Sequence, residues 1–197
     1  MSWQRRVDSK DYKDKKMAVN KRYNSLKLKL SRWVLANNLK KAQRVIQICS
    51  LQNASTIGVT FVAKSPTHLK DVNKFIKELN TRGIKISALG YIPEKKPNDF
   101  FLSDKTINFF YDKELDWLYR SKNEEAIRFQ NTEFDILIDI DGYEYFPMQL
   151  LLNSSKARFK VGRFCENSPF DLMIDVKKSS DIKFYFEQIT HYLLKFN

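Results

Sequence analysis

Two aspartates, Asp139 and Asp141, come closest in type and spacing to a catalytic or metal-binding pattern. They lie at the carboxyl end of the mainly apolar run Phe134–Ile140, which predicts a buried strand. Open α/β sheets bind ligands at this end, where two carboxylates can hold a divalent cation with a diphosphate. The alternative is a solvated strand end, because Asp is common where a strand meets a turn. We favour the second interpretation and predict no metal site.

The segment Ser65-Pro66-Thr67-His68 opens a predicted helix directly after another strand. Free amides at a helix start can hold a phosphate, but phosphate loops need Gly so that the backbone can approach closely. No Gly lies in this segment, and no GxGxxG or Walker-type string occurs in the chain. We therefore expect an ordinary helix N-cap and no cofactor.

The sequence contains no motif for nucleophilic catalysis either. The chain has two histidines, His68 and His191, and neither is paired by motif with a Ser or Cys, although pairing in space stays open. The cysteines Cys49 and Cys165 form neither a disulfide framework nor a metal spacing. The first residues are followed by charged residues and not by the apolar core that a signal peptide needs. No apolar stretch approaches the ~20 residues of a membrane span. We predict no catalytic residue, no transmembrane segment and a cytoplasmic location.

The charge of the chain is unevenly distributed. Residues 1–45 hold 14 Lys and Arg against three Asp, a net charge of +11, whereas residues 46–197 carry +1. Such asymmetry indicates a polyanionic partner for the N-terminal segment.

Basic and aromatic side chains alternate along this segment. Lys and Arg neutralise phosphates and release counterions, and aromatic rings can stack unpaired bases. We predict an RNA-binding arm made of Arg5, Arg6, Lys10, Lys13, Lys15, Lys16, Lys21, Arg22, Lys27, Lys29 and Arg32, with Trp3, Tyr12, Tyr23 and Trp33. A solvated tail without function is the simpler alternative.

A second basic cluster consists of Lys156, Arg158, Lys160 and Arg163. On a strand over 157–161, residues 156, 158 and 160 share one face. They predict either an extension of the phosphate-binding surface or an edge strand that charge protects against aggregation.

Periodicity predicts the fold. Residues 1–24 have too few apolar side chains to bury and should be disordered alone. An amphipathic helix is predicted over 25–45, and its stripe of Leu35, Leu39, Ala42 and Ile46 should pack on the body. Strands are predicted over 56–62, 84–92, 106–111, 134–140, 157–161 and 172–176. Helices are predicted from Ser65-Pro66, over 112–130 with Leu115, Leu118 and Trp117 buried, over 147–153 and at the C-terminus. Strands alternating with helices indicate a doubly wound, mostly parallel Rossmann-like α/β sheet. The expected organisation is an arm and helix over 1–45 and an α/β domain over 46–197.

Five segments carry a resemblance to a bacterial family of small Rossmann-like proteins known as a domain of unknown function. They are Ile57-Gly58-Val59, Leu89-Gly90-Tyr91, Phe134–Asp139, Lys160–Arg163 and Asp171–Asp175, within residues 45–195. This resemblance implies a fold and no activity.

The strand Phe134–Asp139 and the segment Lys156–Arg163 also resemble the N-terminal half of heptosyltransferase-type glycosyltransferases. Those enzymes bind their sugar nucleotide mainly with a second Rossmann-like domain. The present chain has one, so the resemblance implies an incomplete donor site.

Three functions compete. We favour a non-catalytic RNA-associated protein, bound to ribosomal RNA through the arm, with the α/β body as a platform for a protein partner. A peripheral membrane protein is the second, because Leu26, Leu28, Leu30, Trp33, Val34 and Leu35 lie beside Lys27, Lys29 and Arg32. The alternation of these leucines, however, spreads them around a helix. A nucleotide or nucleotide-sugar enzyme using a strand-end cleft near Asp139 and Asp141 is the third.

Overall fold

The computed structural model describes residues 23–41, 44–95, 101–176 and 181–196. Its centre is one sheet of six parallel strands in the order β3-β2-β1-β4-β5-β6. The strands are β1 (Thr56–Val62), β2 (Lys85–Ile92), β3 (Ile107–Tyr111), β4 (Ile136–Asp139), β5 (Phe159–Arg163) and β6 (Leu172–Ile174). The predicted doubly wound Rossmann-like fold is confirmed, and within the described chain every strand pairing is parallel.

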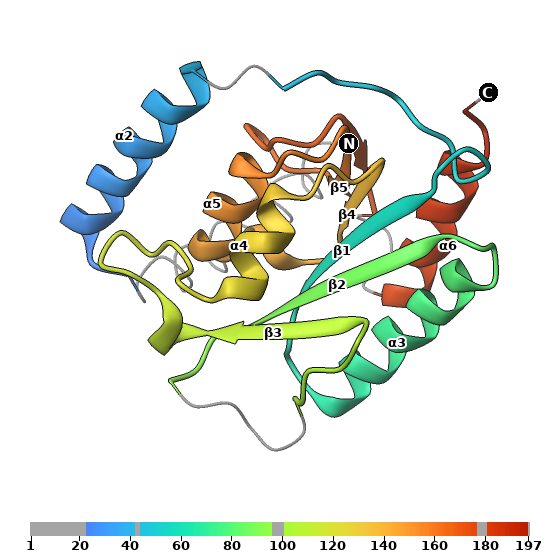
Figure 1. The fold of residues 1–197 in the computed structure, drawn as a ribbon, viewed down its shortest axis with the longest axis horizontal. Coiled ribbons are helices and arrows are strands. Elements are labelled where there is room, and N and C mark those ends of the chain that lie inside the picture. The colour runs from blue at the N-terminus through green and yellow to red at the C-terminus, as the bar shows by residue number, and fades with distance from the viewer. Residues whose placement is uncertain (1–22, 42–43, 96–100, 177–180, 197) are drawn as a thin grey trace, which may run out of the picture.

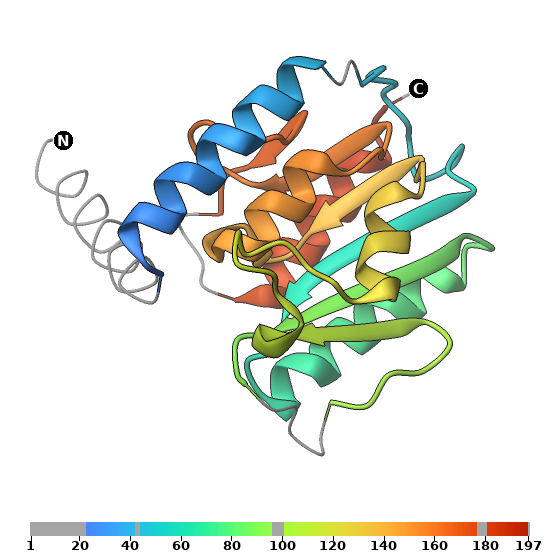
Figure 2. The same ribbon diagram turned by 60° about the vertical axis from the view of Figure 1, so that its left-hand side comes forward.

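Helices cover both faces of the sheet, as Figure 1 shows. One face carries α3 (Pro66–Asn80) and α6 (Ile182–Leu193), and the other carries α4 (Glu124–Asn131) and α5 (Phe146–Ser154). The helix α2 (Ser25–Lys41) lies outside α5 and forms a further layer, which is seen most clearly in Figure 2. Two short 3₁₀ turns, η1 (Asp112–Glu114) and η2 (Gly142–Glu144), follow β3 and β4.

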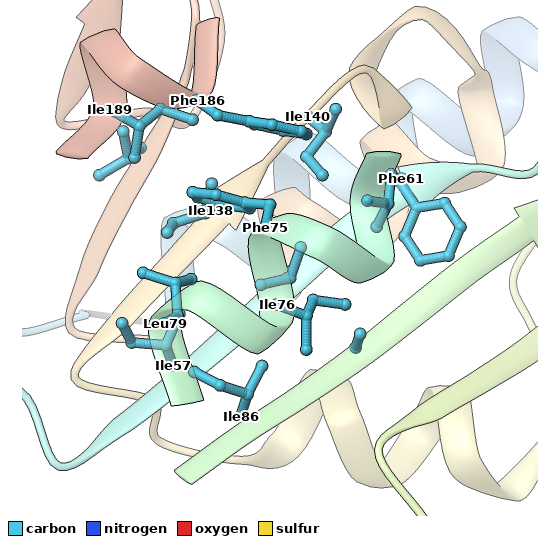
Figure 3. Close-up of a cluster of buried hydrophobic side chains, with 14 of the residues drawn as sticks. Ile57, Phe61, Phe75, Ile76, Leu79, Ile86, Ile138, Ile140, Phe186 and Ile189 are labelled. Atoms are coloured by element: carbon cyan, nitrogen blue, oxygen red, sulfur yellow. The ribbon is translucent and has the colours of Figure 1, made fainter. Parts of the chain in front are cut away.

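The larger core lies between the sheet and the helices α3 and α6. Its strands are continuous apolar runs because both faces of a parallel sheet are buried. The rings of Phe75 on α3 and Phe186 on α6 stack with centroids 4.2 Å apart and planes 5° from parallel (Figure 3). Both helices therefore pack on each other as well as on the sheet.

Helix α3 forms where the sequence predicts it. Ser65 is the N-cap, and its hydroxyl accepts a hydrogen bond from the amide of His68, while Pro66 occupies the first helical position. The chain then turns at Gly83, whose φ of 78° suits a residue without a Cβ. The expected strand–helix–strand unit is confirmed.

The helix predicted over 112–130 is wrong in its first half. After η1 the chain forms a loop closed by a bridge between Leu115 and Ser121, and α4 begins only at Glu124. The carboxylate of Asp116 accepts hydrogen bonds from the amides of Leu118 and Arg120, which stabilises this turn in place of a helix. Leu118 is buried as expected, but Trp117 is 60% exposed.

The segment between α2 and β1 is held against the C-terminal half of the domain. The guanidinium of Arg44 donates hydrogen bonds to the carbonyls of Ala157 and Arg158 and forms an ion pair with Asp171 at 2.5 Å. Farther along, the amide of Leu51 donates to the carbonyl of Leu193 on α6. The segment is therefore fixed at both ends before the chain enters β1.

The core that α3 and α6 share predicts that Phe75→Ala strongly destabilises the protein. Loss of a ring that contacts both Phe186 and the sheet should lower the free energy of unfolding by about 3–5 kcal/mol. Urea denaturation measures this value. The control Trp117→Ala removes an exposed ring and should change it by less than about 0.5 kcal/mol. A cost below about 1 kcal/mol for Phe75→Ala would contradict the shared core.

Candidate functional site

The usual ligand position of this fold lies between β1 and β4, where the order of the strands reverses. Thr60 of β1 and Asp139 of β4 are partners in register there. Lys64 follows β1, and His68 lies in the first turn of α3. Asp141 follows β4, so the structure brings both predicted aspartates to this point.

The carboxylate of Asp139 is buried and serves as an acceptor for its own chain. One oxygen accepts hydrogen bonds from the hydroxyl of Thr60 at 2.7 Å and the amide of Gly142 at 3.0 Å. The other accepts from the amide of Tyr143 at 3.0 Å. Burial raises the pKa of Asp139 to about 7 against the effect of these donors, and the nearby charge of Asp141 acts in the same direction as burial.

The carboxylate of Asp141 joins β1 to the start of α3. Its Oδ1 accepts from the amide of Val62 at 2.8 Å, and its Oδ2 lies 2.7 Å from Nζ of Lys64. Nε2 of His68 is 3.1 Å from the same oxygen, but its geometry is not that of a hydrogen bond. Burial by itself favours the protonated form, yet His68 and Lys64 together hold the pKa of Asp141 below its ordinary value.

An internal anion therefore occupies the region where Rossmann-like proteins bind a phosphate. All four carboxylate oxygens of Asp139 and Asp141 already accept a donor from the protein. Among the described residues, no three His, Cys, Asp or Glu side chains gather as metal ligands. The arrangement fits a structural tie between β1, β4 and α3 better than a nucleotide site.

The second basic cluster is not one surface, and this corrects both sequence-based interpretations. The strand is Phe159–Arg163 and not 157–161, and β6 separates it from the edge of the sheet. Lys156 and Arg158 are exposed, but Lys160 is only 1% exposed. Arg163 points to the opposite face, where its guanidinium lies 4.3 Å from the ring centroid of Tyr185.

Lys160 is the one fully buried basic side chain among the described residues. It points toward α5, where its amine donates to the carbonyl of Leu152 at 2.7 Å. Burial lowers the pKa of Lys160 to about 7, and the charge of Arg44 adds to this effect while Asp171 opposes it. The acceptor lies in the last turn of the helix, whose dipole favours a positive charge.

Most of the predicted RNA-binding arm lies outside the described residues. This holds for Trp3, Tyr12 and the basic positions Arg5, Arg6, Lys10, Lys13, Lys15, Lys16, Lys21 and Arg22. Lys27, Lys29, Arg32 and Trp33 are exposed on α2. Tyr23 is 7% exposed and packs edge-on against Tyr119 and Phe146, so its ring is not accessible to a base.

Helix α2 packs on the body through an apolar stripe that begins earlier than predicted, at Leu28, and includes the predicted Leu35. Leu28 packs against Phe146 and Leu150 of α5 together with Tyr23, and Leu35 is half-buried beside them. The helix ends at Lys41, so the predicted stripe residue Ile46 lies beyond it and is 58% exposed. The side chains of Leu39 and Ala42 lie outside the described residues.

Three apolar side chains of α2 face away from the body. Leu26 is 76% exposed, Leu30 40% and Trp33 64%, and we call these three residues the outer ridge. Their spacings of four and three residues place them on one helical stripe, opposite Leu28 and Leu35. The sequence contains this signal, but only the packing of Leu28 on α5 shows which leucines face outward.

Comparison with known proteins identifies a family and no activity. A model described as a family of unknown function (DUF6913) matches residues 27–196. No curated protein and no solved structure matches the chain. No helix in the described parts of the chain has the length and apolar character needed to span a bilayer.

The tie at Asp141 predicts a pH-dependent effect of Asp141→Asn. An amide nitrogen would face Lys64 and His68, so unfolding at pH 7 should become easier by about 1–3 kcal/mol. Because the pKa of Asp141 is lowered in the folded state, its contribution is present above about pH 4 and is lost as the pH falls further. Urea denaturation at pH 7 and pH 3 measures the difference between variant and wild type. Glu78→Gln, on the exposed side of α3, is the control, and equal costs for both variants would contradict the tie.

Lys160→Met should stabilise the protein at neutral pH. The lowered pKa means that the unfolded chain holds a proton that the folded chain releases, so this residue makes stability rise between about pH 7 and pH 10.4. We expect a gain of about 1–3 kcal/mol at pH 7 that shrinks toward pH 10. Chemical denaturation at both pH values tests this, with the exposed Lys156→Met as control. A loss of stability at both would mean that the hydrogen bond to Leu152 outweighs the burial of the amine.

Proposed function

Because the chain belongs to this family of unknown function, its activity must be argued from its own residues, and we propose that it is a non-catalytic RNA-associated protein. Its N-terminal arm binds RNA, with ribosomal RNA as the leading candidate, and the α/β body carries a protein contact. The observation behind this proposal is the net charge of +11 in residues 1–45 against +1 in the remainder. A body so close to neutral has no general need for a strongly basic extension.

The chemistry of the arm supports RNA rather than a single small anion. Eight Lys and Arg lie between residues 5 and 22, with Tyr12 among them and Trp3 just before them. Extended runs of positive charge neutralise many phosphates at once, and aromatic rings add stacking on unpaired bases. A single phosphate ligand would need only two or three of these groups in a fixed cradle.

The attachment of the arm also supports an anchoring role. The amide of Asn24 donates a hydrogen bond to the hydroxyl of Tyr119 at 2.9 Å, and the ring of Tyr23 is buried beside it. The arm therefore joins the body at a fixed point, directly before α2. Lys27, Lys29 and Arg32 continue the positive charge along that helix, although Arg32 also lies 5.7 Å from the ring centroid of Phe146.

The region between β1 and β4 favours a binding role over nucleotide chemistry. The carboxylate of Asp141 already holds the amide of Val62 and the amine of Lys64. A nucleotide phosphate placed there would have to displace this carboxylate or lie beside its charge. This geometry weighs against the enzyme alternative near Asp139 and Asp141.

Sedimentation with ribosomes across a salt series tests the proposal. Contacts to six to ten phosphates predict that the association constant falls ~10³–10⁵-fold between 50 and 200 mM salt. Replacing Lys13, Lys15 and Lys16 by Gln should lower the slope of log K against log salt by about 3, roughly one per phosphate contact. The matched control replaces Lys70, Lys74 and Lys77 on the exposed side of α3 and should leave the slope unchanged.

Two outcomes would overturn this assignment. One is equal loss of ribosome binding in both triple variants, which would mean a general charge effect. The other is the absence of the full chain from the pellet even at low salt. Pelleting that survives both substitutions and high salt would place recognition in the α/β body.

A further inference from the structure

Exposed apolar side chains are concentrated at the N-terminal end of the described chain. Among the residues that the structure describes, twelve large hydrophobic side chains are exposed, and six of them lie between residues 26 and 48. Three form the outer ridge of α2, and the others are Val45, Ile46 and Ile48 in the segment that follows. Single exposed leucines need no explanation, but a gathered apolar surface indicates a partner.

The outer ridge lies beside basic side chains on a helix that is packed on the body. Leu26, Leu30 and Trp33 form the stripe, and Lys27, Lys29 and Arg32 are exposed beside it. The sequence of α2 contains no acidic residue. The opposite side of the helix packs on α5 through Leu28. Figure 2 shows α2 outside α5, so the exposed ridge faces away from that helix.

The chemistry of the ridge distinguishes three occupants. A second copy of the chain would bring two sets of basic residues together with no acidic partner on the helix. RNA could stack a base on Trp33 but offers nothing apolar to Leu26 and Leu30. An anionic lipid surface offers hydrocarbon to all three apolar side chains and phosphate or carboxylate groups to Lys27 and Lys29 beside them.

We propose that the outer ridge of α2 inserts into the interfacial layer of an anionic lipid bilayer, with the helix lying along the surface. Helices of this composition bury their apolar side roughly 5–10 Å into the boundary of headgroups and acyl chains. The 17 residues of α2 span about 25 Å at 1.5 Å per residue. Three apolar side chains alone bind weakly, and the neighbouring basic charge supplies the second attraction that stable anchoring needs.

This inference does not rest on RNA binding. The basic residues of α2 belong to both proposals, but the RNA test changes Lys13, Lys15 and Lys16 of the arm, whereas lipid insertion depends on the exposure of Leu26, Leu30 and Trp33. Each can fail without the other. If both hold, the chain would join an RNA-containing particle to a membrane surface.

Fluorescence of Trp33 in the full chain tests the insertion. Trp3→Phe and Trp117→Phe leave Trp33 as the single tryptophan, and Trp117 is 60% exposed, so its change should cost little stability. With vesicles of phosphatidylcholine and phosphatidylserine, we expect a blue-shifted emission that lipids brominated on their acyl chains quench. Vesicles of phosphatidylcholine alone should bind much less. Adding Leu26→Gln and Leu30→Gln should lower the vesicle association constant roughly 10- to 100-fold, because two leucines no longer leave water.

The matched control is Leu102→Gln, since Leu102 is as exposed as Leu26, at 76%, but lies between β2 and β3. It should bind vesicles like the parent. The proposal is overturned if Trp33 shows no blue shift, or if the Leu26→Gln/Leu30→Gln variant binds as well as the parent, which would mean adsorption by charge alone. Quenching of Trp33 by single-stranded RNA, without any response to vesicles, would assign the ridge to RNA. Ribosome sedimentation of the leucine variant should match the parent, which separates this test from that of the arm.

Discussion

A buried carboxylate with three protein donors holds the centre of this fold together. Asp139 joins β4 to β1 through the hydroxyl of Thr60 and fixes the turn into α5 through the amides of Gly142 and Tyr143. Burying a carboxyl group without partners would be costly, so the donors and the burial depend on one another. The backbone beside it is held as well, because the hydroxyl of Tyr185 on α6 donates to the carbonyl of Asp139. One short segment after β4 thus orients helices on both faces of the sheet.

The neighbouring Asp141 extends this constraint toward α3. Many Rossmann-like proteins leave the space between the first and fourth strands open for a ligand, whereas this chain fills it with its own charged groups. The excess positive charge and half of the exposed large apolar side chains of the described residues instead lie near the N-terminus. The body acts as a rigid support to which α2 is fastened by Tyr23 and Leu28.

Most strands and the helix α3 were predictable because their residues carry local signals. β1 and β4 are continuous apolar runs, and α3 begins with a Ser-Pro N-cap and ends near a Gly. The misjudged segments depend on distant contacts. The turn at Asp116 replaces a helix through side-chain bonds to the backbone. The strand β5 extends to Arg163 because it pairs with both β4 and β6, which lie apart from it in sequence. The spacing of Leu26 and Leu30 places them on one stripe, but the packing of Leu28 on Phe146, more than 100 residues away, decides that this stripe faces outward.

The fastening of the segment after α2 has a mechanical meaning. Arg44 binds two carbonyls at the start of β5 and the carboxylate of Asp171, and Leu51 is bonded to α6 before the chain enters β1. A pulling force that detached α2 from α5 would next meet these bonds and would be shared between β5 and the C-terminal helix. The central strand β1 is thereby shielded from direct tension.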